Sequence, residues 1–293
     1  MKILQKQESE LISCFANSFL TVISHDAGGA NVLKSFLQAH NLRPNQLLTN
    51  GPATQIFESV QINDYNDLNK PEELILASTG WQSDFEIRHV SNAIALGKRV
   101  IIFLDHWTNY ASRLKFESEM VLVSEIVTFD LEAKRLASNI FTNATIYSFD
   151  NYYLQEQVVL VSNLRKKSNK FLYDFLFIGE PIRDQGYSEE DALQYFLSKV
   201  KRSDYISPNI AIRPHPSQSR DKYLQMLSKF QEFHICVTEN TSLHEDLSNS
   251  KAIVGCNSMA LELSNICQIP TYSAVPESFY SVLPSNRFLK WEY

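Results

Sequence analysis

Short apolar runs alternate with longer amphipathic patterns along most of the chain. The runs are rich in Val, Ile, Leu and Phe, which is typical of strands that are buried on both faces of a parallel sheet. They predict strands at 19–23, 47–49, 73–78, 99–104, 120–123, 126–129, 171–178, 209–212, 233–237, 252–255 and 271–274. The amphipathic patterns predict helices at 30–40, 84–96, 131–138, 188–200, 221–230 and 259–266.

This alternation predicts an α/β fold whose parallel strands are joined by right-handed crossovers. The expected strands outnumber the ~10 that one open twisted sheet usually holds, so two sheets are expected. A polar stretch at 162–170 precedes a fresh apolar run and is the best boundary. We therefore expect two Rossmann-like domains, residues 1–165 and 166–293, whose parallel sheets face a central cleft.

The first candidate site is Arg213-Pro214-His215-Pro216-Ser217, directly after an apolar run. The two prolines end the strand abruptly and stiffen the turn. Ligands of open parallel sheets bind at the C-terminal edge of the strands. An Arg side chain forks onto phosphate, and a His side chain can donate to a phosphoryl oxygen. We expect Arg213, His215 and Ser217 to bind the phosphate of a nucleotide.

A second cluster follows the apolar run that ends at Gly255. Asn257 or Ser258 opens the next helix, and the free N–H groups and partial positive charge of a helix N-terminus suit a phosphate. Glu262 lies one turn further on, where its carboxylate could accept both hydroxyls of a ribose. The alternative for Glu262 is an acid of the first turn that the helix dipole favours. Gly255, Asn257, Ser258 and Glu262 are assigned to nucleotide binding.

In the N-terminal half, His25, Asp26, Gly28 and Gly29 follow the first strong strand. Paired glycines let the backbone turn tightly and approach a ligand, so Gly28 and Gly29 are assigned to the acceptor or sugar. Asp26 is the expected catalytic base, with His25 as an alternative. Another explanation is that Asp26 caps the following helix and the glycines only turn the chain, since G-G without a full G-x-G-x-x-G is a weak dinucleotide signal.

A second polar loop in this half follows the apolar run at 99–104. Loops that crowd polar and aromatic residues carry function more often than packing. Asp105 and His106 are therefore further candidates for the base, and Trp107 and Asn109 are assigned to sugar binding. The alternative is a hydrogen-bonded turn that the aromatic residue covers.

A third loop, at 78–86, carries another aromatic residue. Trp81 is assigned to stacking on a sugar, with a cover over the core as the alternative. Ser83 and Glu86 have the spacing of a capping box. In such a box the Ser83 side chain would accept from the backbone N–H group of Glu86, and the Glu86 side chain would accept from the backbone N–H group of Ser83. We expect the three loops to converge, because all of them leave the C-terminal ends of strands.

Composition narrows the class of partner. The chain of 293 residues has a net charge of −6 and a sequence pI near 5.7. Its Lys and Arg residues are scattered, so nucleic acid is not expected as a partner. No Cys/His or His/Glu set has the spacing of metal ligands, so no metal is expected.

The spacing of the cysteines and the length of the apolar runs indicate the cellular compartment of the protein. Cys14, Cys236, Cys256 and Cys267 include no C-x-x-C pair, so free thiols and a cytoplasmic location are expected. The first residues lack the apolar core of a signal peptide, and no apolar run reaches the ~20 residues that cross a bilayer. Peripheral association with the inner membrane through an acceptor lipid stays open.

The second half resembles the nucleotide-binding half of GT-B glycosyltransferases. It is most similar to the bacterial CMP-sugar-dependent sialyl, polysialyl and Kdo transferases of surface-polysaccharide biosynthesis. Those families carry a His-Pro motif that contacts the phosphate of a CMP-sugar, which His215-Pro216 matches. They also carry a Ser or Ser-Ser motif at a helix N-terminus, which Asn257-Ser258 matches with one Ser. The resemblance covers about residues 208–276, and over the first half it is only architectural.

The resemblance implies a metal-independent glycosyltransferase that moves a sugar from a nucleotide-sugar, with a CMP-sugar favoured, to a saccharide or glycolipid acceptor. The nucleotide-sugar is a substrate, so no cofactor is expected. Transfer passes through an oxocarbenium-like state, while a base takes the acceptor proton and protein charges neutralise the leaving phosphate.

Two alternatives stay open. One is a sugar-nucleotide hydrolase or 2-epimerase of the same architecture. The other is a non-catalytic protein that binds nucleotide-sugars. The motif of two acidic residues and a glycine that holds the base of the family has no clear counterpart here, which favours the second alternative.

Overall fold

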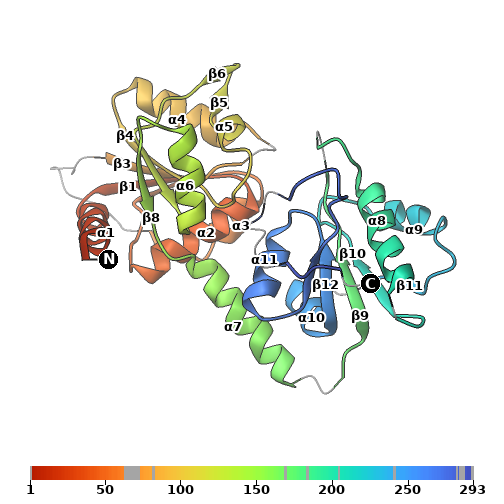
Figure 1. Ribbon diagram of the computed structural model, residues 1–293. Coiled ribbons are helices and arrows are strands. Elements are labelled where there is room, and N and C mark those ends of the chain that lie inside the picture. Colours follow the sequence, from red (N-terminus) through yellow and green to blue (C-terminus); the bar gives the residue numbers. More distant parts are fainter. Residues whose placement is uncertain are drawn as a thin grey trace. The chain divides into compact units, whose positions relative to one another are not determined.

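The computed structural model describes residues 2–62, 73–80, 83–167, 170–182, 185–203, 205–239, 242–281, 283 and 288–291. The chain divides into two compact units, Met1–Leu154 and Gln155–Tyr293. Each unit is a layered α/β structure around a parallel sheet (Figure 1). The expectation of two parallel sheets is thereby confirmed.

The first unit contains a parallel sheet in the order β2-β1-β3-β4-β7-β8. Its strands are β1 (Phe19–Ser24), β2 (Gln46–Thr49), β3 (Glu73–Ala77), β4 (Arg99–Phe103), β7 (Glu125–Thr128) and β8 (Thr145–Ser148). Its helices are α1 (Lys2–Ala16), α2 (Ala27–Ala39), α3 (Pro52–Phe57), α4 (Phe85–Ala95), α5 (Tyr110–Arg113) and α6 (Leu131–Ile140).

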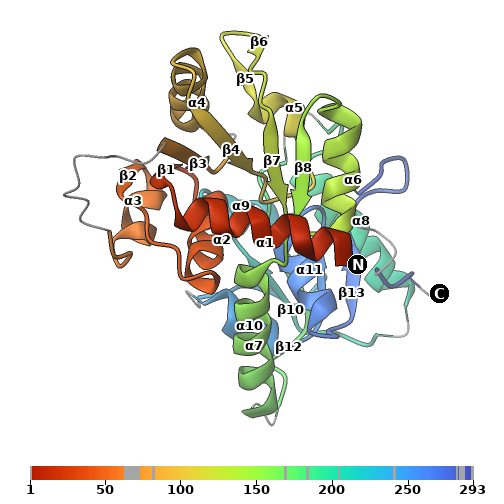
Figure 2. The ribbon, with the colours of Figure 1, turned by 90° about the vertical axis from the view of Figure 1, so that its left-hand side faces the viewer.

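Side chains alternate along each strand, so the apolar runs of this sheet feed two cores. Val22 of β1 belongs to a cluster with Phe15 of α1 and Phe36 of α2. The next residue, Ile23, belongs to a different cluster with Val90 of α4. Helices therefore cover both faces of the sheet, with α1 and α2 on the same face (Figure 2). Strands that are buried on both faces need near-continuous apolar sequence, which is the pattern seen here.

The second unit contains a parallel sheet in the order β11-β10-β9-β12-β13. Its strands are β9 (Tyr173–Ile178), β10 (Ile210–Arg213), β11 (Ile235–Val237), β12 (Ser250–Gly255) and β13 (Thr271–Ser273). Its helices are α8 (Glu189–Arg202), α9 (Arg220–Leu227), α10 (Leu243–Ser248) and α11 (Met259–Ile266). Phe177 of β9, Phe196 of α8 and Tyr223 of α9 belong to its core.

One helix runs across the division between the units. It is α7 (Tyr152–Lys167), so residues 162–167 of the polar stretch that was expected to mark the domain boundary are helical. Arg165 of α7 donates to the carbonyl of Ser250 at 2.8 Å within the second unit. The predicted domain boundary at 165–166 falls at the end of this helix, and the domain limits themselves stay a prediction.

The structure differs from the expected strands at two places: one expected strand is absent, and one strand was not expected. Residues 121–124 form no strand; a short antiparallel hairpin of β5 (Lys115–Phe116) and β6 (Glu119–Met120) precedes them. The edge strand β8 was missed because its sequence, Thr-Ile-Tyr-Ser, is mixed and none of its residues is buried. Among the described residues, no helix is long and apolar enough to cross a membrane.

Candidate functional sites

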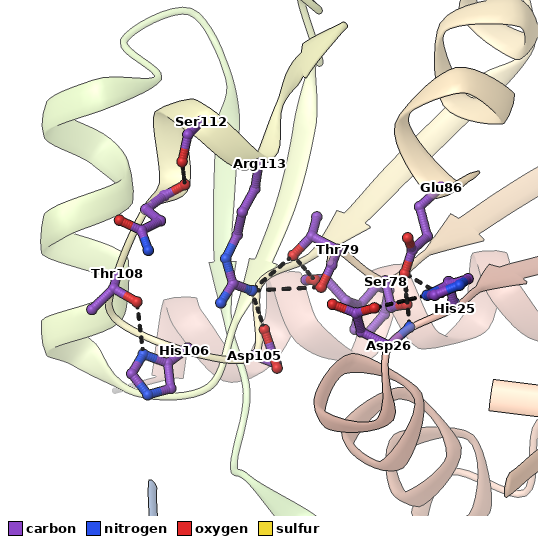
Figure 3. A network of polar contacts seen from close by, with 12 residues as sticks. His25, Asp26, Ser78, Thr79, Glu86, Asp105, His106, Thr108, Ser112 and Arg113 are labelled. Carbon is purple, nitrogen blue, oxygen red and sulfur yellow. Dashed lines mark hydrogen bonds and ion pairs between the residues drawn. The ribbon is translucent and has the colours of Figure 1, made fainter. Parts of the chain in front are cut away.

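A His–Asp pair lies at the C-terminal end of β1, where α2 begins (Figure 3). His25 Nδ1 donates to Asp26 Oδ1 at 2.8 Å, and the two side chains are 21% and 17% exposed. Asp26 occupies the N-cap position of α2, but its carboxylate makes no capping hydrogen bond. Asp26 therefore orients the imidazole next to it.

The pair has a defined chemistry. An ionised carboxylate only accepts hydrogen bonds, so its contact with Nδ1 keeps the proton on that nitrogen and leaves Nε2 as an acceptor. A Cβ atom at Gly51 would lie 2.7 Å from His25 Nε2, so the glycine leaves the room that the ring occupies. A neutral imidazole held in this tautomer is suited to take a proton from a substrate.

Glu86 holds the backbone of this loop, and sequence reasoning missed that role. Its Oε1 accepts from the backbone N–H groups of His25 at 2.9 Å and Asp26 at 3.3 Å, and from the Ser78 hydroxyl at 3.2 Å. Glu86 is 2% exposed, and burial raises the pKa of its carboxyl, while the N–H group of His25 opposes the rise.

The expected capping box at the start of α4 is wrong. The N-cap residue is Asp84, and Ser83 Oγ only accepts from the Phe85 N–H group at 3.1 Å. The Glu86 carboxylate turns toward β1. A signal was present in the sequence, because Glu86 shares the buried stripe of α4 with Val90 and Ala93, where an acid is unusual.

Close packing accounts for the paired glycines. A Cβ atom at Gly28 would lie 2.5 Å from Asp105 Oδ2, and one at Gly29 would lie 2.7 Å from Ser78 Cβ. These contacts bring the loops after β1, β3 and β4 together, as the sequence predicted for all three. The assignment of Gly28 and Gly29 to sugar or acceptor binding stays a prediction.

The loop after β4 is organised by a buried arginine. Arg113 Nη1 forms an ion pair with Asp105 Oδ1 and donates to Thr79 Oγ1 at 3.3 Å (Figure 3). The Arg113 side chain is 6% exposed. Asp105 is therefore committed to a structural ion pair, which favours the His25–Asp26 pair as the catalytic group. His106 Nδ1 lies 3.1 Å from Thr108 Oγ1, and its catalytic role stays a prediction.

The structure favours the alternative for Trp107, and its assignment to sugar binding stays a prediction. Trp107 is 8% exposed, and its indole N–H group donates to Asp130 Oδ2 at 2.8 Å. It thus covers the core, which was the alternative for this loop. Asn109 is exposed, with φ of 59°, at the start of α5, and its role stays a prediction. Trp81 lies outside the described residues.

In the second unit, His215 is held by the turn after β10. The Ser217 N–H group donates to His215 Nδ1 at 3.1 Å, and the Ser217 hydroxyl lies 2.8 Å from the same nitrogen. A ring that accepts at Nδ1 carries its proton on Nε2 when neutral. Burial lowers the pKa of His215, against an opposing effect of Glu189, so the neutral ring is favoured near pH 7. His215 thus offers an Nε2–H donor.

Arg213 has a partner inside the fold. Its Nη1 forms an ion pair with Asp246 Oδ2 at 2.5 Å, and Thr238 Oγ1 donates to the same oxygen at 3.0 Å. Asp246 is fully buried, so this pair keeps a buried carboxylate neutralised. Binding of phosphate by the other N–H groups of Arg213 stays a prediction.

A carboxylate occupies the start of α11, where the sequence predicts a phosphate. Glu180 Oε2 accepts from the Asn257 N–H group at 2.8 Å. Burial raises the pKa of Glu180 to about 7, the N–H groups of Asn257 and Ser258 oppose this rise, and the charge of Glu189 adds to it. Ser258 Oγ caps the helix by accepting from the Ala260 N–H group at 3.2 Å.

Gly255, in the same cluster, has a packing role. A Cβ atom at Gly255 would lie 2.9 Å from Leu261 Cδ1, so this glycine lets α11 pack closely on β12. Glu262 is 3% exposed. Ribose binding by Glu262 and phosphate binding by Asn257 and Ser258 stay predictions. Among the residues described, no group of three or more His, Cys, Asp or Glu side chains is placed to hold a metal ion.

Comparison with solved structures identifies the fold. The UDP-GlcNAc 2-epimerase from Methanocaldococcus jannaschii matches 87% of this chain and 83% of its own, with a TM-score of 0.56 and 13% identity. A structure of that enzyme in complex with UDP-GlcNAc and UDP matches the same shares of the two chains, with a TM-score of 0.57 and 14% identity. The UDP-N-acetylglucosamine 2-epimerase from Rickettsia bellii matches 86% of this chain and 78% of its own, with a TM-score of 0.57 and 13% identity.

The chain has the GT-B fold. At these identities the likeness concerns the fold alone, and the narrower resemblance to CMP-sugar transferases stays a prediction. No protein-family model and no curated protein matches the sequence.

Proposed function

We propose that this GT-B protein is an enzyme that acts on a nucleotide-sugar. The observation that carries the proposal is the geometry of His215. The backbone of Ser217 holds the imidazole so that a neutral Nε2–H donor stands at the C-terminal edge of β10. That edge is the ligand-binding edge of an open parallel sheet, and a phosphoryl oxygen is a strong acceptor for such a donor.

The His25–Asp26 pair of the first unit supports an enzyme rather than a binding protein. A partly exposed imidazole that a carboxylate orients is an arrangement for moving protons. The pair can deprotonate water, a sugar hydroxyl or a ring carbon, so it is compatible with several reactions of sugar nucleotides.

Among these reactions we favour 2-epimerisation or hydrolysis of a sugar nucleotide. Three solved structures that share the fold over most of both chains are UDP-GlcNAc 2-epimerases, and one of them holds UDP-GlcNAc and UDP. A 2-epimerase requires a base that reaches the proton on C2, and a hydrolase requires one that reaches water. His25 would serve either reaction through Nε2, and His215 would stabilise charge on the phosphate.

Glycosyl transfer is the second candidate. The positions of His215-Pro216 and Asn257-Ser258 at the ends of β10 and β12 agree with the motifs of CMP-sugar transferases. A transferase of this kind would use His25 to take the proton of an acceptor hydroxyl. The donor would then be a CMP-sugar and the acceptor a saccharide or glycolipid.

Binding comes first in the test. A thermal-shift screen of CMP, UDP, GDP, CDP and ADP identifies the nucleotide, and calorimetry measures its affinity. His215→Ala should weaken binding by about 1.5–3 kcal/mol, the range for a hydrogen bond to a charged group. The matched control is His234→Ala, an exposed histidine of the same unit. Equal affinities of wild type and His215→Ala would remove His215 from the site.

Turnover separates the candidate functions. UDP-GlcNAc is incubated with the protein and without any acceptor, and proton NMR follows the anomeric signals. Release of UDP, or appearance of the C2 epimer, supports the favoured reaction. Turnover of a CMP-sugar only when a saccharide acceptor is added supports the transferase. Tight binding of a nucleotide-sugar with no turnover in either assay identifies a binding protein.

A further inference from the structure

Two buried side chains of the second unit connect the loops that follow β9 and β10. Tyr223 of α9 is fully buried, and Glu189 of α8 is 5% exposed. The Tyr223 hydroxyl donates to Glu189 Oε1 at 2.7 Å. Burial and the charge of Glu189 raise the pKa of the Tyr223 phenol, so this group keeps its proton and remains a donor. Because both side chains are buried, they act on a ligand only through the loops that they contact.

The Tyr223 hydroxyl also contacts the turn that carries His215. The backbone N–H group of His215 donates to the hydroxyl oxygen at 3.5 Å, and the side-chain amide of Gln218 contacts the same oxygen. The Gln218 N–H group closes the turn on the His215 carbonyl at 2.9 Å. A phenol has one proton, and a carboxylate is a stronger acceptor than an amide. The proton therefore goes to Glu189, and the oxygen is an acceptor for the turn.

The same carboxylate holds the loop after β9. Glu189 Oε1 accepts from the backbone N–H group of Glu180 at 2.7 Å, and Glu189 Oε2 forms an ion pair with Lys222. Gly179 allows the close approach of the tyrosine, because a Cβ atom there would collide with the Tyr223 hydroxyl oxygen. One buried carboxylate thus fixes the backbone of the β9 loop directly and that of the β10 turn through Tyr223.

We propose that Glu189 and Tyr223 are positioning residues that hold His215 for a nucleotide phosphate. The Nε2–H donor of His215 meets a phosphoryl oxygen only while the turn keeps its shape. A donor that is fixed before binding loses less conformational entropy than a mobile one, and buried hydrogen bonds behind it are the usual means of fixing it. The proposal rests on the proposed function in one respect, since it takes the ligand of His215 to be a phosphate.

The first test removes only the hydroxyl. In Tyr223→Phe the ring stays in the core and Glu189 Oε1 still accepts from Glu180, so the chain should fold. Affinity for UDP and for CMP, measured by calorimetry, should fall about threefold to tenfold, since one neutral hydrogen bond to the turn is lost. The matched control is Tyr195→Phe, whose hydroxyl bonds to Glu277 and which should bind as wild type does. Equal affinities of Tyr223→Phe and wild type overturn the proposal.

A measurement without ligand separates this inference from the proposed function. The ring nitrogens of the histidines are isotope-labelled, and the NMR signals of His215 are assigned by their loss in His215→Ala. At neutral pH the wild-type ring should show an unprotonated Nδ1 and a protonated Nε2. In Tyr223→Phe both signals should move toward the averaged shifts of a mobile imidazole. Unchanged shifts overturn this inference, whereas failure of wild type to bind either nucleotide contradicts the proposed function alone.

Two variants of Glu189 separate its hydrogen bonds from its charge. Glu189→Gln keeps an oxygen for the Tyr223 hydroxyl and the Glu180 N–H group, so nucleotide affinity should stay within about twofold of wild type. Glu189→Ala removes the acceptor of both donors, and affinity should fall about tenfold or more. Urea unfolding shows whether each variant is folded under the binding conditions, and Tyr223→Phe decides if Glu189→Ala is not. Wild-type affinity in Glu189→Ala, or equal losses in both variants, would overturn the proposal.

Discussion

The Glu180 carboxylate accepts the N–H group that the sequence offers to a phosphate at the start of α11. A helix N-terminus attracts any anion, and the protein supplies one from the end of β9. A nucleotide phosphate at this position has to displace Glu180 or bind beside it. The charge of this one residue therefore affects both the stability of the second unit and its affinity for anions.

The raised pKa of Glu180 gives a stability prediction. Its carboxyl titrates near 7 when folded and near its ordinary 4.5 when unfolded. Between these values the folded chain keeps a proton that the unfolded chain has lost, so the free energy of unfolding falls as pH rises from about 4.5 to about 7. As pH rises through this window, the free energy of unfolding of Glu180→Gln should therefore increase relative to that of wild type by up to about 1 kcal/mol per pH unit. Urea unfolding of both proteins at pH 5, 6 and 7.5 measures this difference. If the free energies of unfolding of the two proteins changed in parallel with pH, the prediction would be contradicted.

The His25–Asp26 pair gives a prediction for turnover. Asp26→Asn keeps the shape of the side chain but no longer fixes the proton on His25 Nδ1. It should lower turnover by about 10²–10⁴-fold and leave nucleotide affinity nearly unchanged. Steady-state rates and calorimetry on the same preparation measure both. Asp84→Asn, at an exposed position of the same unit, is the control. A full rate in Asp26→Asn would move the base to another residue.

At the scale of elements, the first unit depends on how closely α2 approaches the end of β3. Gly29 lies in the first turn of α2, and a Cβ atom there would stand 2.7 Å from Ser78 Cβ and 3.2 Å from the Thr79 carbonyl oxygen. Both neighbours belong to the segment that follows β3, and the Ser78 hydroxyl is bonded to Glu86. A small shift of α2 would therefore move Ser78, and with it the Glu86 carboxylate that holds the His25 loop.

Gly29→Ala should destabilise the protein although alanine is the better helix former. The new methyl group has no room, and overpacking of this kind costs about 1–3 kcal/mol in the free energy of unfolding. Urea unfolding measures the change. Gln38→Ala, at an exposed position of the same helix, should be neutral within about 0.5 kcal/mol. Equal stability of Gly29→Ala and wild type would show that the helix moves freely.

At the scale of the whole molecule, each unit has its own sheet and its own apolar cores. Domains with a separate core can fold alone. In the second unit, Trp291 stacks on Tyr272 with ring centroids 4.3 Å apart and donates to the Ser273 carbonyl at 3.2 Å. The end of the described chain is thereby attached to its edge strand β13.

A fragment of residues 155–293 should therefore fold by itself. Trp291 is its only tryptophan, so fluorescence reports on the packing of that residue against β13. We expect one cooperative transition in urea by fluorescence and by far-UV circular dichroism, with the same midpoint. A broad or probe-dependent transition would mean that this unit needs residues 1–154. The intact chain under the same conditions is the control.

Local pattern was sufficient for the strands that are buried on both faces. The apolar runs at β1, β3, β4, β9, β10 and β12 marked the strands that are buried on both faces, because such strands need continuous apolar sequence whatever their neighbours are. The same pattern missed β8, whose residues are half-buried or exposed, and α7, whose polar end at 162–167 has the composition expected of a domain boundary. Whether such a segment is regular depends on the surface against which it packs.

The candidate sites divide in the same way. Chain position alone placed His25, Asp26 and His215 at strand ends, because parallel strands end at one edge of a sheet. It could not pair Glu86 with His25, Arg113 with Asp105, or Glu180 with Asn257. Each of these contacts joins a side chain to a residue of another element, through a backbone N–H group in two cases and through an ion pair in the third. A carboxylate that caps its own helix has the same sequence as one that turns to another strand. Only packing in three dimensions selects the partner, since burial makes an unpaired charge too costly to keep.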